Sequence, residues 1–289
     1  MRRPLRTEPN PFVDYEWETF SYLEYDNYFE GLKSYLKYLE LKPPELDVSA
    51  VMLNEVFRAF NETGFYELAR SYAEKYLTLT QDYDRYYYQM LMVERWQGNY
   101  RAEQKYIYRW WELDNSSTST YFSWVSNYIY LNKLDSAYHY LQLLEADRQR
   151  KGQNLSPNTV YGYVYMKLGQ KSEAEYHLKG SLSYWKKNIK LKTPNAQKGT
   201  AYFWLVLTYS ILEDGPNTIK HLEYLKEFST LNNSYYTDLK DLSCFDFVRN
   251  TPEFQSVLKH LEKVNRKEHR RIARLLKQQG YPFSQETNW

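Results

Sequence analysis

The segment MKLGQKSEAEYHL, Met166 to Leu178, contains the pattern that decides the fold. Gly169 follows a helical run and can adopt the left-handed backbone that ends many helices. Ala174, five positions later, is a small residue in the first turns of the next helical run. The pattern predicts two helices joined by a tight turn, with Ala174 where they cross closely.

The same turn and small residue recur along the chain. Gly64 is followed by Ala69, and Asn132 by Ala137, both at the spacing found after Gly169. We interpret Ala102, one residue early, and Leu32 as the corresponding residues of two further units. The predicted turn positions, separated by 37, 34, 34, 37 and 45 residues, are Asn27, Gly64, Gly98, Asn132, Gly169 and Asp214.

Each unit contains two amphipathic runs, because apolar residues recur at helical spacing on both sides of each turn. A period near 34 residues made of two such helices resembles the tetratricopeptide repeat. A single hairpin cannot bury both of its faces, so neighbouring hairpins are expected to stack. The resemblance implies an all-α, right-handed superhelix, or α-solenoid, of about six hairpins.

After the sixth unit the pattern changes to a motif that resembles the closing element of arrays in bacterial regulators. We expect Thr251 to cap a helix opened by Pro252, and the apolar side chains of that helix, from Phe254 to Leu261, to cover the exposed end of the array. The predicted organisation is an extension (1–12), the repeat array (13–237), a C-terminal helical cap (238–280) and a tail (281–289). The motif residues are Phe245, Asp246, Phe247, Arg249, Asn250, Pro252 and Phe254.

Composition and motifs argue against several classes of function. The 38 basic and 36 acidic residues give a net charge of +2, so we do not expect nucleic acid as a general partner. Cys244 is the single cysteine, and we expect it to be buried. The longest apolar run, 201–207, is too short to span a membrane, and no signal peptide is expected. These features do not determine the cellular compartment of the protein.

No enzyme signature is present, and we expect a non-catalytic protein without cofactor or metal. His139, His177 and His221 fall on the second helices of three different hairpins, so we expect surface side chains rather than a shared metal site.

The predicted function is a scaffold that binds a protein or peptide segment in a groove. The resemblance implies that the first helix of each hairpin lines this groove, and aromatic residues with a few arginines are typical of binding hot spots. Alternatively, several of these side chains fill the groove themselves. A second candidate is a sensory domain that binds a small molecule or glycan through Trp17, Trp96 and Trp204. The predicted groove residues are Trp17, Tyr25, Asn54, Arg58, Asn61, Tyr88, Met92, Arg95, Trp96, Phe122, Tyr130, Tyr163, Met166 and Trp204.

Charge is distributed unevenly along the chain. Seven carboxylates and no Lys or Arg occur from Glu8 to Glu30, so the first hairpin is acidic. The last helix is basic, and its basic face is either solvated or docks to an acidic partner, an anionic lipid surface or nucleic acid. Salt-sensitive head-to-tail self-association is a further prediction. The basic residues are Lys263, Arg266, Lys267, Arg270, Arg271 and Arg274.

Overall fold

A computed structural model describes residues 11–115, 117–228 and 233–281 of the chain. Residues 1–10 of the predicted extension and residues 282–289 of the predicted tail lie outside this range. The described residues form helices and no strands, which confirms the all-α prediction. They belong to two compact units: unit 1 contains Met1–Tyr86 and Glu262–Trp289, and unit 2 contains Tyr87–Leu261.

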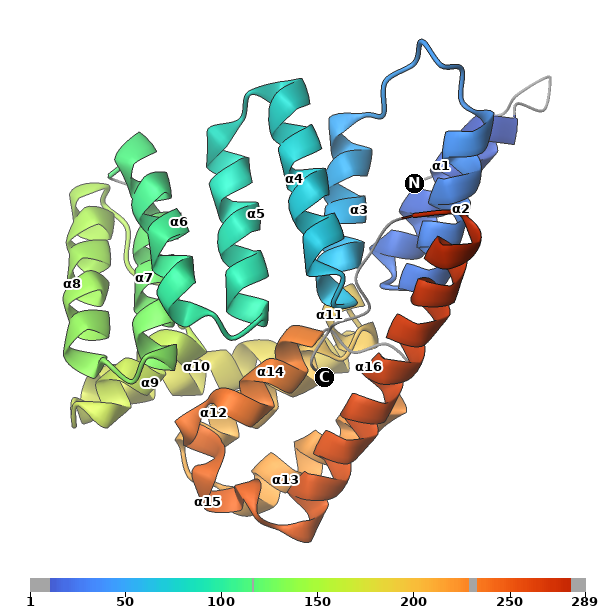
Figure 1. Cartoon of the computed structure of the whole chain (residues 1–289). Coiled ribbons are helices and arrows are strands. Elements are labelled where there is room, and N and C mark those ends of the chain that lie inside the picture. The colour runs from blue at the N-terminus through green and yellow to red at the C-terminus, as the bar shows by residue number, and fades with distance from the viewer. Residues whose placement is uncertain (1–10, 116, 229–232, 282–289) are drawn as a thin grey trace. The chain divides into compact units, whose positions relative to one another are not determined.

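Twelve of the helices pair as antiparallel hairpins, as Figure 1 shows. Within unit 1, α3 packs on both helices of the first hairpin. Within unit 2, α7 packs on α6, α9 on α8, and α12 on α10. This repetitive packing is that of an α-solenoid. The hairpins are α1 (Pro11–Glu24) with α2 (Tyr28–Leu41), α3 (Ala50–Glu62) with α4 (Tyr66–Thr80), α5 (Tyr83–Trp96) with α6 (Tyr100–Leu113), α7 (Thr118–Tyr130) with α8 (Leu134–Arg150), α9 (Thr159–Lys167) with α10 (Lys171–Lys190), and α12 (Thr200–Ile211) with α13 (Gly215–Tyr224).

A left-handed residue ends the first helix of every hairpin. Four are the predicted ones, with φ between 53° and 81° at Gly64, Gly98, Asn132 and Gly169. In the first and last hairpins the left-handed residue is instead Asp26 (φ 58°) and Glu213 (φ 54°), one position before the predicted Asn27 and Asp214.

Asn27 and Asp214 have a different role, because both occupy the N-cap position of the helix that follows. The Asp214 carboxylate accepts a hydrogen bond from the backbone N–H of Asn217 at 3.1 Å. Short polar residues such as Asn and Asp are common at both the left-handed position and the N-cap position. The residue type alone therefore did not distinguish the turn residue from the N-cap.

The small-residue position lies five residues after the left-handed residue in all six hairpins. Two predictions for this position were therefore wrong. In the first hairpin the position holds Gly31 rather than Leu32, and a Cβ on Gly31 would lie 2.4 Å from Leu23 Cδ2. In the third hairpin the position holds Glu103, which is fully buried, whereas Ala102 is half-buried. The six residues are Gly31, Ala69, Glu103, Ala137, Ala174 and Thr218.

One short helix before the last hairpin and several elements after it complete unit 2. Their buried residues, including Leu239, Phe245 and Phe254, join the core formed by the hairpins. The Thr251 hydroxyl accepts a hydrogen bond from Phe254 N–H at 3.3 Å, which confirms the predicted cap. The elements are α11 (Pro194–Gln197), the 3₁₀ turns Leu225–Glu227 (η1) and Ser243–Phe245 (η2), α14 (Asn233–Asp241), α15 (Asp246–Arg249) and the first part of α16 (Pro252–Gln278).

Arg249, a member of the closing motif, has a structural role at the end of α14. Its guanidinium donates to the carbonyl oxygens of Leu239, Lys240 and Leu242 at 2.5–2.6 Å. These carbonyls belong to the last turn of α14 and the residue after it, where no further helical turn supplies N–H donors. Arg249 therefore fixes the end of α14.

The acidic first hairpin and the second half of α16 both belong to unit 1 and contact each other. Glu268 accepts a hydrogen bond from Phe29 N–H at 3.0 Å. Arg271 lies 3.9 Å from Glu30, and its guanidinium covers the Phe29 ring. Part of the charge complementarity behind the self-association prediction is thus satisfied within one chain.

The described helices include none that is both long and apolar enough to cross a lipid bilayer.

Replacing Ala174 with leucine should destabilise the protein, because Ala174 is fully buried between α9 and α10. We expect a loss of about 1 to 3 kcal/mol from overpacking. The exposed Ala146 of α8 provides a matched control, since Ala146→Leu adds the same atoms to the surface. Urea unfolding measures both variants, and equal stabilities would contradict the assignment of the crossing point.

Candidate functional site

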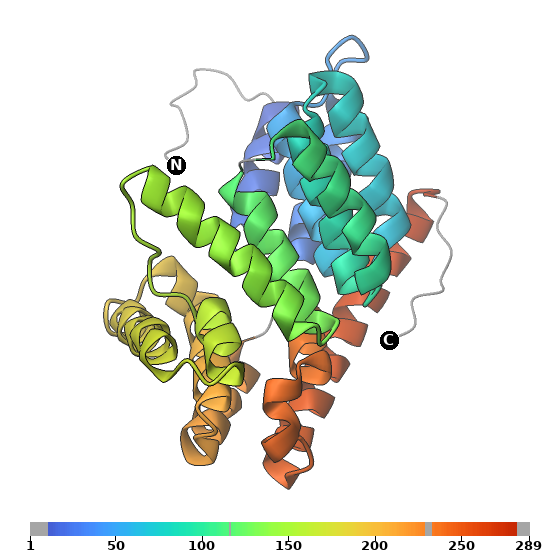
Figure 2. The same ribbon diagram turned by 90° about the vertical axis from the view of Figure 1, so that its left-hand side faces the viewer.

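The predicted inward positions of unit 2 do not face an empty groove, because α14 and η2 lie against them. The Tyr130 hydroxyl donates to Asp238 Oδ1 at 2.5 Å, and Tyr163 forms a 3.0 Å hydrogen bond with Ser243. Figure 2 shows α14, in orange, beside the end of α7. The segment predicted to cover only the end of the array therefore contacts its inward residues.

Two contacts at the ends of α14 were not predicted from the sequence. The Tyr100 hydroxyl, at the start of α6, donates to Asp241 Oδ2 at 2.7 Å. At the other end of α14, Tyr235 stacks on Phe203 of α12, with ring centroids 4.1 Å apart and nearly parallel planes. Contacts of α14 and η2 thus reach α6, α7, α9 and α12.

An ion pair occupies the close crossing of the third hairpin. Arg95 Nη2 lies 2.5 Å from Glu103 Oε1, and Asn127 of α7 donates to Glu103 Oε2 at 3.0 Å. The Arg95 guanidinium also lies 5.8 Å from the centre of the Tyr130 ring. Because a buried carboxylate needs partners, Glu103 links its own hairpin to the next one and to the ring that holds α14.

Asp238 is half-buried beside these groups, and its removal from water raises its pKa to about 7. The hydrogen bond from Tyr130 and the charge of Arg95 oppose this rise, and the neighbouring Asp241 adds to it. The protonation of Asp238 therefore changes near neutral pH.

The position of the left-handed residue changes which side chains face inward in the first and last hairpins. Because one residue rotates a helix by about 100°, moving the turn to Glu213 places Phe203 rather than Trp204 at the inward position. Trp204 instead stacks on Trp185 of α10 at 5.9 Å. The same shift applies to Trp17, which is half-buried, and to Tyr25, which is 60% exposed.

Two of the predicted groove residues of unit 1, Arg58 and Asn54, connect hairpins. Arg58 pairs with Asp26 of the first hairpin at 2.6 Å. Asn54 accepts hydrogen bonds from Arg85 at 2.7 and 2.9 Å. Asn61 is fully buried, and its amide makes no hydrogen bond with any residue that the structure describes.

The remaining predicted groove residues belong to unit 2 and are half-buried. The rings of Tyr88 on α5 and Trp110 pack edge to face with centroids 5.7 Å apart, and those of Phe122 on α7 and Tyr161 do the same at 5.9 Å. Tyr88 and Phe122 occupy equivalent positions, each ten residues before the left-handed residue. The other members are Met92, Trp96 and Met166.

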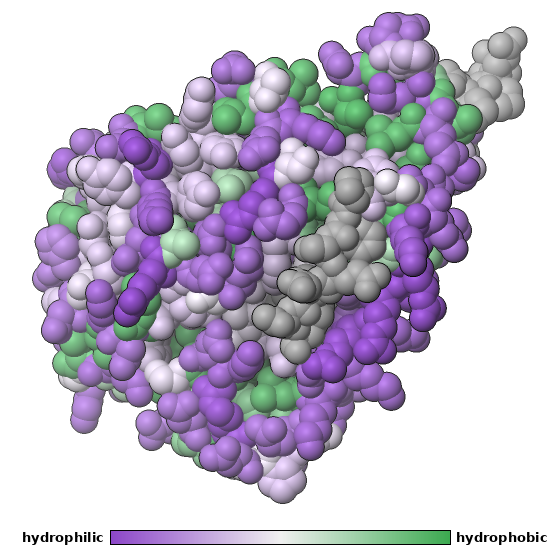
Figure 3. Space-filling view, in the orientation of Figure 1, coloured by the Kyte–Doolittle hydropathy of each residue, from purple (hydrophilic) through white to green (hydrophobic). Residues whose placement is uncertain are grey.

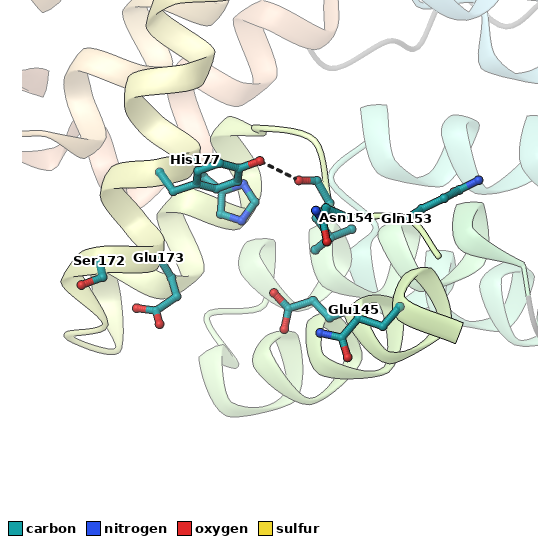
Figure 4. Close-up of a pocket in the computed structure, with 9 residues that line it drawn as sticks. Glu145, Gln153, Asn154, Ser172, Glu173 and His177 are labelled. Carbon is teal, nitrogen blue, oxygen red and sulfur yellow. Dashed lines mark hydrogen bonds between the residues drawn. The ribbon is translucent and has the colours of Figure 1, made fainter. Parts of the chain in front are cut away.

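A pocket of about 470 Å³ lies between α8, the loop 151–158 and α10. Figure 4 shows Glu145 and Glu173 reaching toward it from α8 and α10. The sequence did not predict this site, because its residues come from the second helices and a connecting loop. The lining residues are Glu145, Gln149, Gln153, Asn154, Leu155, Ser172, Glu173, Tyr176 and His177.

His177 at this pocket is 3% exposed, so the prediction of a surface side chain was wrong. Its ring stacks on Tyr165 at 5.6 Å, and Nδ1 accepts a hydrogen bond from Asn158 N–H at 3.3 Å. Burial lowers the pKa of His177, which favours the neutral ring. The pocket therefore offers carboxylate and amide groups for hydrogen bonding, and Nδ1 is already occupied and not free to act as a base.

No protein-family model matches this sequence, and a search of curated proteins finds no match.

Removing the Glu103 carboxylate should destabilise unit 2, because Arg95 would be left as a nearly buried cation without this partner. We expect Glu103→Ala to lose roughly 3 kcal/mol of unfolding free energy. The double variant Arg95→Met with Glu103→Ala should recover much of this loss. Urea unfolding of Glu103→Ala, Arg95→Met and the double variant provides the test. A double variant as unstable as the sum of the two single ones would contradict a direct ion pair.

The raised pKa of Asp238 predicts a loss of stability as the pH rises. An unfolded aspartate has a pKa of about 3.9, so between this value and about 7 the folded chain holds a proton that the unfolded chain has lost. The stabilisation is complete below about pH 4 and disappears as the pH rises through 7.

The unfolding free energy of the parent should therefore fall by roughly 1.4 kcal/mol per pH unit between about pH 5 and pH 7. Asp238→Asn has no carboxyl to titrate, so it should lose less stability than the parent between about pH 5 and pH 8. Urea unfolding at the two pH values measures the difference. The exposed Asp135→Asn serves as control and should follow the parent. If the stability of the parent and of Asp238→Asn changed equally with pH, the raised pKa of Asp238 would be contradicted.

Proposed function

We propose that this chain is a non-catalytic scaffold resembling tetratricopeptide proteins, and that it binds a protein or peptide segment. The observation that carries the proposal is the way in which unit 2 holds its own helix α14. Aromatic stacking and tyrosine hydroxyls provide these contacts, and the half-buried Arg95 lies against the ring of Tyr130, one of the contacting tyrosines. These groups are also common at protein–protein hot spots.

The partner would contact inward residues beyond those that hold α14. Tyr88 and Phe122 form a repeated pair, because they occupy equivalent positions on α5 and α7 and both are half-buried. Rigid rings of this kind bury a large apolar area while losing little side-chain entropy on binding. An extended segment could follow this repeated spacing from one hairpin to the next.

The closing motif supports a regulatory setting for the scaffold. Its residues resemble the element that ends such arrays in bacterial regulators, and in this chain Arg249 of that motif holds the end of α14. We therefore propose that the chain is bacterial and that binding of the segment takes place within a regulatory or signalling assembly.

Tyr88→Ala and Phe122→Ala should each weaken binding of the partner segment by about 1 to 3 kcal/mol. The partner would be captured on the immobilised full chain, and its binding segment would be titrated as a synthetic peptide by calorimetry. Tyr108→Ala is a suitable control, because Tyr108 is 50% exposed on the second helix α6. Unchanged affinity in both Tyr88→Ala and Phe122→Ala would refute this binding surface.

A further inference from the structure

The second half of α16 carries a row of five exposed cations on one face. Their spacing alternates between four and three residues, and we call this row the basic stripe. Figure 3 shows strongly hydrophilic side chains gathered over this helix. The members are Lys263, Lys267, Arg270, Arg274 and Lys277.

Helix geometry makes the basic stripe narrow and straight. At about 100° per residue the five side chains fall within an arc of roughly 80°, and they extend over about 21 Å of helix. The opposite side of α16 is held by unit 1: Ile272 and Leu276 are fully buried, and His269 stacks on Phe65 at 4.2 Å. His269 Nδ1 also lies 2.8 Å from the carbonyl oxygen of Thr63. These contacts turn the stripe outward.

The acidic residues of this half-helix pair with other groups. Glu262 forms an ion pair with Arg266 at 2.5 Å. Glu268 pairs with Arg271 at 3.0 Å and also accepts the Phe29 N–H. Among the residues that the structure describes, the five stripe cations have no ion-pair partner within 4.0 Å. The stripe therefore presents five positive charges that no ion pair among the described residues neutralises.

We infer that the basic stripe docks an acidic helical segment of a partner protein. Carboxylates spaced four and three residues apart on the partner would form a matching straight row, as charged positions do along the flanks of paired helices. This inference rests on the proposed scaffold function, and it specifies the chemistry of one contact surface of the partner.

Two other anionic partners fit the surface less well. A helix that binds within a membrane interface needs an exposed apolar face, and the apolar face of this helix is buried in unit 1. Duplex nucleic acid attracts proteins through a broad positive field, whereas this chain has a net charge of +2 and the stripe is a single row of side chains.

The experiment uses the full chain and two labelled peptides of about 20 residues with the same composition. In the patterned peptide five glutamates follow the four-three spacing on one helical face, and in the permuted peptide they are distributed around the helix. Fluorescence anisotropy measures binding at about 50 mM and about 300 mM salt. A DNA duplex and anionic lipid vesicles are measured in parallel.

The variant Lys267→Glu with Arg270→Glu reverses two stripe charges. Lys187→Glu with Lys190→Glu on α10 is the matched control, because these lysines are exposed, three residues apart, and change the net charge equally. Lys267→Gln with Arg270→Gln is a milder second variant in case charge reversal disturbs the helix. Circular dichroism compares the folding of all three.

We expect the patterned peptide to bind more tightly than the permuted one and to bind more weakly at higher salt. The stripe variants should weaken this binding by about fivefold to tenfold, and the α10 control by less than about twofold. Equal binding of the two peptides, equal losses in stripe and control variants, or no binding would overturn the inference. Tighter binding of the duplex or of the vesicles would assign the stripe to that ligand instead. The Tyr88 and Phe122 experiment is unaffected by any of these outcomes.

Discussion

The close crossing of two helices in each hairpin is the constraint on which this structure depends. A left-handed residue ends the first helix, and five residues later the second helix passes so near that little room remains for a side chain. At Gly31 even a single added carbon would lie 2.4 Å from Leu23. Because each hairpin has apolar residues on both faces, this shared geometry lets successive hairpins pack in the same way within each unit.

In the third hairpin the residue at the close crossing is charged rather than small. Glu103 occupies the crossing, and it is tolerated there because Arg95 and Asn127 satisfy its carboxylate. The arginine in turn lies over Tyr130, whose hydroxyl holds Asp238 of α14. Glu103, which stands where other hairpins have a small residue, thus connects two hairpins, through Arg95 and Tyr130, to helix α14. A polar network of this kind favours a single arrangement of its members, since each buried polar group needs a specific partner.

Helix α16 shows how one element can serve two surfaces. Its buried and basic rows both follow spacings close to the helical period of about 3.6 residues, so they stay on opposite sides along the helix. The buried row attaches the helix to unit 1, and the basic row faces outward. The acidic first hairpin, which the sequence suggested as a partner for another copy, instead contacts Arg271 in the same chain.

The sequence by itself determined the helical hairpins, their number, four of the six turn residues and the cap at Thr251. These features depend on contacts between residues near in the chain, namely the hydrophobic period and the conformational freedom of glycine and asparagine. The tertiary structure decided what the inward residues contact. Arg58, Tyr130 and Tyr163 bind other parts of the chain, and Phe203 replaces Trp204 because Glu213, not Asp214, is left-handed. The burial of His177 and the approach of α14 depend on residues far apart in sequence, and no local pattern encodes which distant side chains will meet.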